Sequence, residues 1–289
     1  MPGPGCPLSP PADARVAIRV ISLEGSAQRR EAMAARLAAL GLAFRFFPAV
    51  DGRRLSPDDK TRDYSPSRSL RLGLGYVSPL SDPELGCALS HLAVCRSLLA
   101  ERLPAALVLE DDAVAGPSLP PVLDALAEAF PADRPAVVLL TWAKNYYPAS
   151  RRPLRDGIDL VRMYGASCAA GYFLTRAAAA ILAERLHPVW TRADDWRRFR
   201  GFVPLYGLDP HVISHDDGQA STIALGGDRR VNRPKRRWWW LQRPDWMVRR
   251  VWYRLGEWGH RLRHRVKRQP RGACRLDAMR RDPAPPRGP

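Results

Sequence analysis

Three adjacent carboxylates, Glu110, Asp111 and Asp112, follow a short apolar segment that is typical of a buried strand. Neighbouring carboxylates repel one another and lose solvation when they are buried, so they need a compensating cation. Hard divalent ions such as Mg²⁺ and Mn²⁺ prefer oxygen ligands and often bridge to a substrate phosphate. A solvated acidic turn is the alternative, and the acidic triplet alone leaves both interpretations open.

Two further polar features lie where they can reach a ligand. Asp51 follows another predicted strand, and in open parallel sheets ligands bind beyond the carboxyl ends of the strands. Asp51 is also beside Gly52, where a turn aspartate can bond its own backbone. Ser90 and His91 lie in the middle of a predicted helix, with His91 away from the centre of its apolar stripe. Each of them can line a pocket or serve the structure alone.

The elements that must position these residues alternate between strands and helices. This order predicts an α/β fold with a mainly parallel sheet and helices on both faces. Two long segments, 53–80 and 142–158, are expected to be loops. The predicted strands are 16–23, 43–50, 105–109, 136–140 and 166–174, and the predicted helices are 27–40, 84–102, 119–130 and 176–186.

The chain of 289 residues is long enough for one large α/β domain with additional elements. No apolar run approaches the roughly 18 to 20 residues that span a bilayer, and the first residues do not have the pattern of a secretory signal. The 5 cysteines are odd in number and include no C-x-x-C pair, which favours a reducing compartment. A cytoplasmic location is therefore expected.

The basic charge of the chain is concentrated at its C-terminal end. Residues 229–289 carry 20 Lys and Arg against 4 Asp and Glu, whereas residues 1–228 are nearly neutral. Residues 1–14 and 269–289 are expected to be disordered. Residues 229–268 interleave arginine with tryptophan at helical spacing, which predicts a basic helix in a membrane interface. A helix packed on the domain and a nucleic-acid-binding segment are the alternatives.

Neither a P-loop nor a G-x-G-x-x-G motif follows the first strand, so two common nucleotide folds lack support. A different ordered set of short motifs, over about residues 15–225, resembles glycosyltransferase family 25, whose bacterial members build lipooligosaccharide. The motifs are Ile21-Ser22-Leu23, Arg29-Arg30, Phe47-Pro48-Ala49-Val50-Asp51-Gly52, Gly86-Cys87-Ala88-Leu89-Ser90-His91-Leu92, Leu109-Glu110-Asp111-Asp112, Gly171-Tyr172, Asp195-Trp196 with Phe199, and Ser221-Thr222-Ile223.

The resemblance implies a GT-A-like domain over residues 15–228 that transfers a sugar, often galactose from UDP-galactose, with inversion. Glu110 and Asp112 would hold Mn²⁺ or Mg²⁺ on the donor diphosphate, because alternate residues of an extended chain share a face. Asp111 would instead contact the ribose or the sugar. The acceptor would be a saccharide, lipid-linked, at the cytoplasmic face of the membrane.

The remaining candidate roles follow from the same resemblance. Ser22 and Leu23 would line the uridine pocket, and Asp51 would accept from uracil or ribose. Arg29 or Arg30 would reach a phosphate, unless the pair forms a solvated helix face. The polar cluster near the end of the domain would add a last metal or pyrophosphate contact, and it comprises His211, His215, Asp216 and Asp217.

An inverting transfer also needs a general base for the acceptor hydroxyl. Asp194 or Asp195 is the candidate, in a segment rich in tryptophan and phenylalanine that can stack on a sugar or pack in the core. The doubled aspartate departs from the family pattern, as does the basic C-terminal segment. Two other functions compete with this one: a non-enzymatic protein that binds a membrane surface or nucleic acid, and a nucleotidyltransferase that acts on a sugar phosphate.

Overall fold

The structure is a computed structural model that describes residues 15–71, 80–142, 145–215 and 244–268. Both termini predicted to be disordered lie outside this part of the chain, as do Asp216, Asp217 and the segment 221–223. The helices are α1 (Ala27–Ala39), η1 (Gly52–Arg54), α2 (Pro57–Asp63), α3 (Pro66–Arg71), α4 (Asp82–Ala100), α5 (Leu119–Ala129), α6 (Arg176–Arg185), α7 (Trp196–Phe199) and α9 (Pro244–Arg263). The strands are β1 (Ala17–Ser22), β2 (Arg45–Pro48), β3 (Ala105–Glu110), β4 (Ala113–Ala115), β5 (Val137–Leu139), β6 (Asn145–Arg155), β7 (Ile158–Gly165), β8 (Gly171–Thr175), β9 (Leu205–Asp209), β10 (Ile213–His215) and β11 (Lys267–Arg268).

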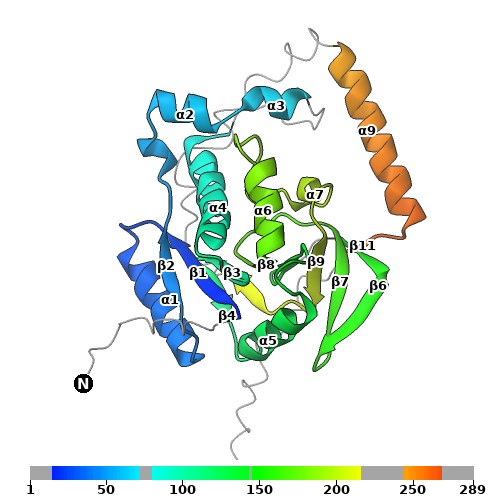
Figure 1. Ribbon diagram of the computed structural model, residues 1–289. Coiled ribbons are helices and arrows are strands. Elements are labelled where there is room, and N and C mark those ends of the chain that lie inside the picture. The colour runs from blue at the N-terminus through cyan, green and yellow to red at the C-terminus, as the bar shows by residue number, and fades with distance from the viewer. Residues whose placement is uncertain (1–14, 72–79, 143–144, 216–243, 269–289) are drawn as a thin grey trace, which may run out of the picture.

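The central sheet is mixed, so the prediction of a mainly parallel sheet is wrong. Within the described residues its order is β11-β6-β7-β9-β5-β8-β3-β1-β2, and β4 pairs separately with β10 (Figure 1). Strands β1, β2 and β3 are parallel to one another, as expected. Strand β8, however, runs antiparallel between β3 and β5, and β6, β7 and β9 follow one another antiparallel. The α/β class and the covering helices are confirmed.

The segment 142–158, predicted as a loop, contains the long strand β6. Its sequence, NYYPASRRPLR, hides the strand because it has two prolines and lacks an alternating apolar pattern. Strand β6 lies at the outer side of the sheet. Of the strands that the structure describes, only the short β11 pairs with it beyond β7, and its register with β7 shifts three times. Proline is tolerated at such edges and irregularities.

Two apolar cores lie on the two faces of the sheet because successive residues of β3 point to opposite sides. Leu107 and Leu109 pack in the core that α1 and α5 cover. Ala106 and Val108 pack in the core that α4 and α6 cover. Figure 1 shows α4 and α6 side by side in front of the sheet.

Helix α4 approaches the loop after β2 at van der Waals distance. Its start is set by Ser81 and Glu84, because the Glu84 carboxylate accepts from the Ser81 backbone N–H at 3.0 Å, as the predicted capping box requires. One turn later, a Cβ on Gly86 would lie 2.4 Å from the Val50 carbonyl oxygen. The Val50 N–H donates to Ser90 Oγ at 2.8 Å. Glycine and serine in α4 thus bring the helix against the end of β2.

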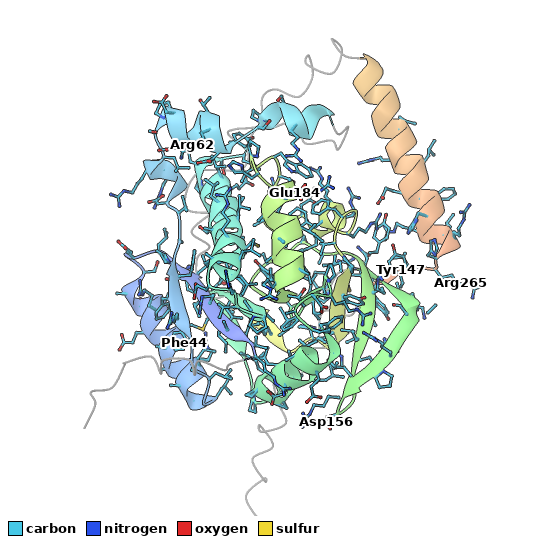
Figure 2. The ribbon with its side chains drawn as sticks, in the orientation of Figure 1. Phe44, Arg62, Tyr147, Asp156, Glu184 and Arg265 are labelled. Atoms are coloured by element: carbon cyan, nitrogen blue, oxygen red, sulfur yellow. The ribbon has the colours of Figure 1, made fainter. Side chains whose placement is uncertain are left out.

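The C-terminal helix α9 contacts the domain through its polar face. Glu257 accepts from Arg200 Nη2 at 2.9 Å and also bonds the Tyr164 hydroxyl. His260 Nε2 lies 2.9 Å from the Tyr147 hydroxyl. Figure 2 shows Tyr147 beside the C-terminal end of this helix. The segment therefore packs on the domain, which was one of the alternatives.

Four apolar side chains in the described part of α9 are exposed on the opposite face. They share the spacing of one helical stripe, and their exposed fractions are 52% for Val251, 54% for Leu255, 64% for Trp258 and 59% for Leu262. Among the helices that the structure describes, none is long and apolar enough to cross a membrane. A role for this stripe at a membrane surface stays a prediction.

Replacement of Gly86 by alanine is expected to destabilise the protein. The new methyl group would meet backbone atoms of Val50 and Gly52, which cannot rotate away, so α4 must shift. Overpacking of this kind costs about 1–3 kcal/mol or more in the free energy of unfolding. Thermal and urea unfolding measure the loss. Gly25→Ala is the matched control, because nothing lies within 4 Å of its added Cβ; equal stability of the two variants would refute the close approach.

Candidate active site

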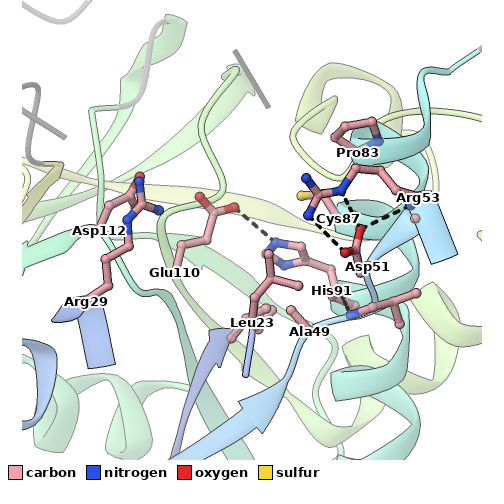
Figure 3. Close-up of a pocket in the computed structure, with 14 residues that line it drawn as sticks. Leu23, Arg29, Ala49, Asp51, Arg53, Pro83, Cys87, His91, Glu110 and Asp112 are labelled. Atoms are coloured by element: carbon pink, nitrogen blue, oxygen red, sulfur yellow. Dashed lines mark hydrogen bonds and ion pairs between the residues drawn. The ribbon is translucent and has the colours of Figure 1, made fainter. Parts of the chain in front are cut away.

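A pocket opens beyond the carboxyl ends of β1 and β2 and beside the end of β3, where ligands of open α/β sheets bind (Figure 3). The N-terminal half of α4 forms another wall. Both acidic features predicted from the sequence reach this pocket. Its lining residues are Ile21, Leu23, Arg29, Ala49, Val50, Asp51, Gly52, Arg53, Pro83, Cys87, Ser90, His91, Glu110 and Asp112.

The acidic triplet divides between two environments. Glu110 and Asp112 both line the pocket, in agreement with their predicted common face. Asp111 instead accepts from Ser22 Oγ at 2.7 Å and pairs with Arg29 Nη1 at 3.2 Å. Ser22 and Asp111 are thereby tied to each other at the junction of β1 and β3, and they are not among the residues that line the pocket.

His91 is buried and bonds on both sides of its ring. Its Nε2 lies 3.2 Å from Glu110 Oε1, and its Nδ1 lies 2.9 Å from the Tyr172 hydroxyl. Burial raises the pKa of Tyr172 well above its usual range, so the phenol keeps its proton. The chain from Tyr172 through His91 orients the Glu110 carboxylate. Figure 3 shows the contact between His91 and Glu110.

Asp51 lines the pocket and also has the turn role that the sequence left open. Its carboxylate accepts from the Arg53 backbone N–H at 3.1 Å and from Arg53 Nε at 2.9 Å. The hydrogen bond from the Arg53 side chain lowers the pKa of Asp51. Asp51 is therefore an anionic acceptor at the pocket, held in place by its own η1 turn.

The two arginines that were predicted to reach a phosphate have different surroundings. Arg29 lines the pocket beside Asp111, whereas the Arg30 guanidinium lies over the Phe46 ring, 4.4 Å from its centroid. Arg30 is not among the lining residues of the pocket, so the prediction that either arginine could reach a phosphate now applies to Arg29. Leu23 lines the pocket as predicted.

Cys87 and Arg53 belong to the pocket, and reasoning from the sequence assigned them no role. Cys87 is one helical turn before His91 on α4, so the spacing of a cysteine and a histidine at i and i+4 could have identified it. Arg53 carried no comparable signal, because arginines are abundant throughout the chain. Ser90 also lines the pocket, but its hydroxyl is engaged by Val50 and by the Gly86 carbonyl, to which it donates at 2.7 Å.

The structure distinguishes the adjacent aspartates. Asp195 accepts from Thr191 Oγ1 at 3.0 Å and pairs with Arg198 Nε at 2.8 Å, at the start of α7. Burial raises the pKa of Asp194, with Arg192 opposing this rise. The negative charges of Asp195 and Glu110 raise it further, which places Asp194 within electrostatic reach of the acidic pocket.

The aromatic residues near these aspartates belong to the core. Trp196 is 2% exposed, as is Phe199, so neither presents a face to a sugar ring. Trp196 instead contacts the Tyr172 ring edge to face, 4.9 Å between centroids. His211 is buried, and β10 pairs His215 with Ala113, next to Asp112 in sequence. The predicted polar cluster thus has one member whose backbone lies beside the acidic segment.

The carboxylates fit a hard divalent cation. Glu110 and Asp112 offer oxygen donors on one wall. Burial, followed by the charges of Glu110, Asp194 and Asp112, holds the pKa of the Cys87 thiol well above its usual range. Excess negative charge of this kind is what a bound cation would neutralise.

The comparison with known families agrees with this arrangement. The family model described as glycosyltransferase family 25 (LPS biosynthesis protein) matches residues 16–196. The chain belongs to this family. The match contains the acidic triplet, the helix α4 with His91, and both candidate base residues. Membership makes the protein a glycosyltransferase and weighs against both the non-enzymatic and the nucleotidyltransferase alternatives.

Bacterial relatives extend over most of the chain. The lacto-N-neotetraose biosynthesis glycosyltransferase LgtE of Neisseria meningitidis serogroup B is 30% identical over 75% of this chain and 82% of its own length. LgtB of Neisseria gonorrhoeae is 30% identical over 76% of this chain and 84% of its own length. An Aedes aegypti "Glycosyltransferase 25 family member" is 39% identical over 33% of this chain, which spans only 16% of that longer protein.

Solved structures add little about the fold. A197 from STIV matches with a TM-score of 0.36 and 13% identity, over 70% of this chain and 86% of its own. Mannose-1-phosphate geranyltransferase from Thermus thermophilus matches with a TM-score of 0.32 and 16% identity, over 67% of this chain and 73% of its own. At these TM-scores neither match defines the architecture.

Asparagine at position 194 is expected to stabilise the protein at neutral pH. A raised pKa in the folded state means that the fold disfavours the Asp194 carboxylate. The protonated Asp194 makes its whole contribution to stability at pH values below the ordinary pKa of aspartate. This contribution is lost as the pH rises through the pKa of Asp194 in the folded protein. Asp194→Asn should therefore exceed the wild type in unfolding free energy at pH 7, and the gap should close toward pH 4. Denaturant unfolding across this pH range measures it.

Asp195→Asn is the matched control and should move stability the other way. It removes the negative charge that pairs with Arg198, whose side chain is only 3% exposed. A buried guanidinium that loses its charged acceptor lowers the free energy of unfolding by about 1–3 kcal/mol. A destabilised Asp194→Asn protein at neutral pH, or an Asp195→Asn protein as stable as the wild type, would contradict the different environments of the two aspartates.

Proposed function

We propose that this protein transfers a hexose, galactose from UDP-galactose, to a lipooligosaccharide acceptor with inversion at the anomeric carbon. The observation that carries the proposal is the pocket at the ends of β1, β2 and β3, where Glu110 and Asp112 face the same space. The role of the LgtE and LgtB relatives in lacto-N-neotetraose biosynthesis, together with the LPS biosynthesis of the family description, supports a lipooligosaccharide-type saccharide as the acceptor. A GT-A-like arrangement of the domain belongs to the same proposal.

The donor would lie across the strand ends. Leu23 and Asp51 would contact the nucleoside, with Asp51 accepting from uracil or ribose. Arg29 would reach a phosphate from the pocket wall, while Asp111 and Ser22 hold its guanidinium in place. Glu110 and Asp112 would hold Mn²⁺ or Mg²⁺, which offsets the negative charge that develops on the departing UDP.

The acceptor hydroxyl would lose its proton to Asp194. Burial raises the pKa of Asp194, and a general base works best when its pKa is near the working pH. The Asp195 carboxylate is instead bound by Arg198 and Thr191. As the proton moves to Asp194, the acceptor oxygen attacks the anomeric carbon from the side opposite UDP. The new glycosidic bond forms while the bond to the diphosphate breaks, which inverts the configuration.

Asp112→Asn should reduce sugar transfer from UDP-galactose about 100-fold or more, because it removes a charge that would hold the cation at the leaving group. Transfer to a short soluble acceptor of the lacto-N-neotetraose type, measured with and without Mn²⁺, tests this. Asp124→Asn is the control, since Asp124 is an exposed carboxylate on α5, on the other face of the sheet from α4. Full activity of Asp112→Asn, or no binding of any UDP-sugar by the wild type, would refute the proposed donor site.

The exposed stripe of α9 supports association with an anionic membrane surface, where a lipid-linked acceptor resides on the cytoplasmic side. Its apolar side chains, Leu255, Trp258 and Leu262 among them, face away from the domain. Arginines such as Arg254 and Arg263 are exposed on the same helix. An amphipathic helix of this composition lies in the interface and is attracted to anionic lipid.

The triple substitution Leu255→Ser, Trp258→Ser, Leu262→Ser should weaken binding to phosphatidylglycerol-containing vesicles at least about tenfold, because the buried apolar area is lost. The three side chains are more than half exposed, so thermal unfolding should remain that of the wild type. Vesicle co-sedimentation measures binding, with phosphatidylcholine vesicles as the control for charge. Undiminished binding of the variant would exclude the stripe as the membrane contact.

A further inference from the structure

One cluster of side chains in the pocket offers metal ligands that differ from a pair of carboxylates. Cys87 and His91 lie at i and i+4 on α4, so their side chains share one helix face. Glu110 faces them from the end of β3. One ligand atom from each of the three residues lies within 4.8 Å of the other two.

The spacing within the cluster suits a small tetrahedral ion. Two nitrogen or oxygen ligands of Zn²⁺, each at about 2.0–2.1 Å, are about 3.3 Å apart in a tetrahedral site. His91 Nε2 and Glu110 Oε1 are 3.2 Å apart. A Zn²⁺ ion can therefore take the place of this contact with small movements of the side chains.

The histidine is also supported on its other side. Tyr172, from β8, lies 2.9 Å from His91 Nδ1 through its hydroxyl. The phenol oxygen can accept from Nδ1–H, which is the tautomer that leaves Nε2 as a metal ligand. Buried second contacts of this kind orient the histidines of metal sites.

We propose that Cys87, His91 and Glu110 form a Zn²⁺ site in the donor pocket, with a fourth position open to the pocket. A thiol and an imidazole select Zn²⁺ over Mg²⁺ and Mn²⁺, which favour oxygen. The Cys87 thiol gives its proton to solvent as the sulfur–zinc bond forms, so one proton is released for each ion bound. The charges of Glu110, Asp194 and Asp112 around the thiol attract the ion.

The site has a consequence for transfer that rests on the proposed function. Glu110 would serve both Zn²⁺ and the hard cation on the donor diphosphate, so the two ions exclude each other. Zn²⁺ is then an inhibitor of sugar transfer, and excess Mn²⁺ relieves the inhibition. The binding of Zn²⁺ itself does not depend on the reaction.

Cobalt is the probe, because Co²⁺ takes tetrahedral zinc sites and a bound thiolate gives it a near-ultraviolet charge-transfer band. The full chain with Cys6 and Cys274 replaced by serine, which removes the two terminal thiols, is titrated with Co²⁺ alone. The expected result is a band that saturates at one equivalent and disappears on addition of Zn²⁺. Cys87→Ser should abolish the band, and Cys168→Ser, the matched control, should retain it. Tyr172→Phe should weaken Co²⁺ binding about 10-fold to 100-fold.

A second measurement needs no variant at Cys87. Binding of Zn²⁺ to the native protein should release one proton for each ion bound, because the Cys87 thiol is protonated before binding, and calorimetry in buffers of different ionisation enthalpy measures this release. The proposal is overturned if no charge-transfer band forms, if Cys87→Ser keeps the band, or if Zn²⁺ binds without releasing a proton. Failure of sugar transfer while the band is intact would overturn only the proposed function, and transfer without any band would overturn only the zinc site.

Discussion

The pair of hydrogen bonds made by His91 is the interaction on which the pocket depends. It links three elements that are distant in sequence: α4, the end of β3 through Glu110, and β8 through Tyr172. A buried imidazole must have both nitrogens satisfied, because an unpaired polar atom in an apolar interior costs about 1–3 kcal/mol. The same two bonds that satisfy His91 therefore set the direction of the Glu110 carboxylate.

The other motif residues of α4 act to bring this histidine to the sheet. Gly86 removes a side chain that would collide with the backbone after β2, and Ser90 accepts from the Val50 N–H at that contact. On β8, the absence of a side chain at Gly171 lets β10 pack closely, since a Cβ there would lie 2.7 Å from Ile213 Cδ1. Several residues that resemble family motifs are thus required by close packing, and this packing positions the few residues that face the pocket.

The acidic pocket and the basic helix α9 divide the protein into two charge environments. Around Glu110 and Asp112 negative charge is concentrated where a cation and a diphosphate would meet. Residues 251–268 contain one carboxylate, Glu257, and it faces the domain, where it binds Arg200 and Tyr164. Its polar contacts use the inward face of the helix, so the apolar face is left for solvent or a membrane.

The sequence by itself determined the α/β class, the parallel strands β1 to β3, the start of α4 and the grouping of Glu110 with Asp112. These features depend on local patterns: a short apolar run in a buried strand, a capping box, and acidic residues at a strand end. Only the tertiary structure decided that β8 runs antiparallel, that 145–155 is a strand, and that Cys87 joins the pocket. Strand direction and edge pairing depend on contacts between distant segments, and they leave no period in the local sequence. The distinction between Asp194 and Asp195 also depends on distant contacts, because Asp194 is buried and lies near Glu110, whereas the partners of Asp195, Thr191 and Arg198, are within four residues of it.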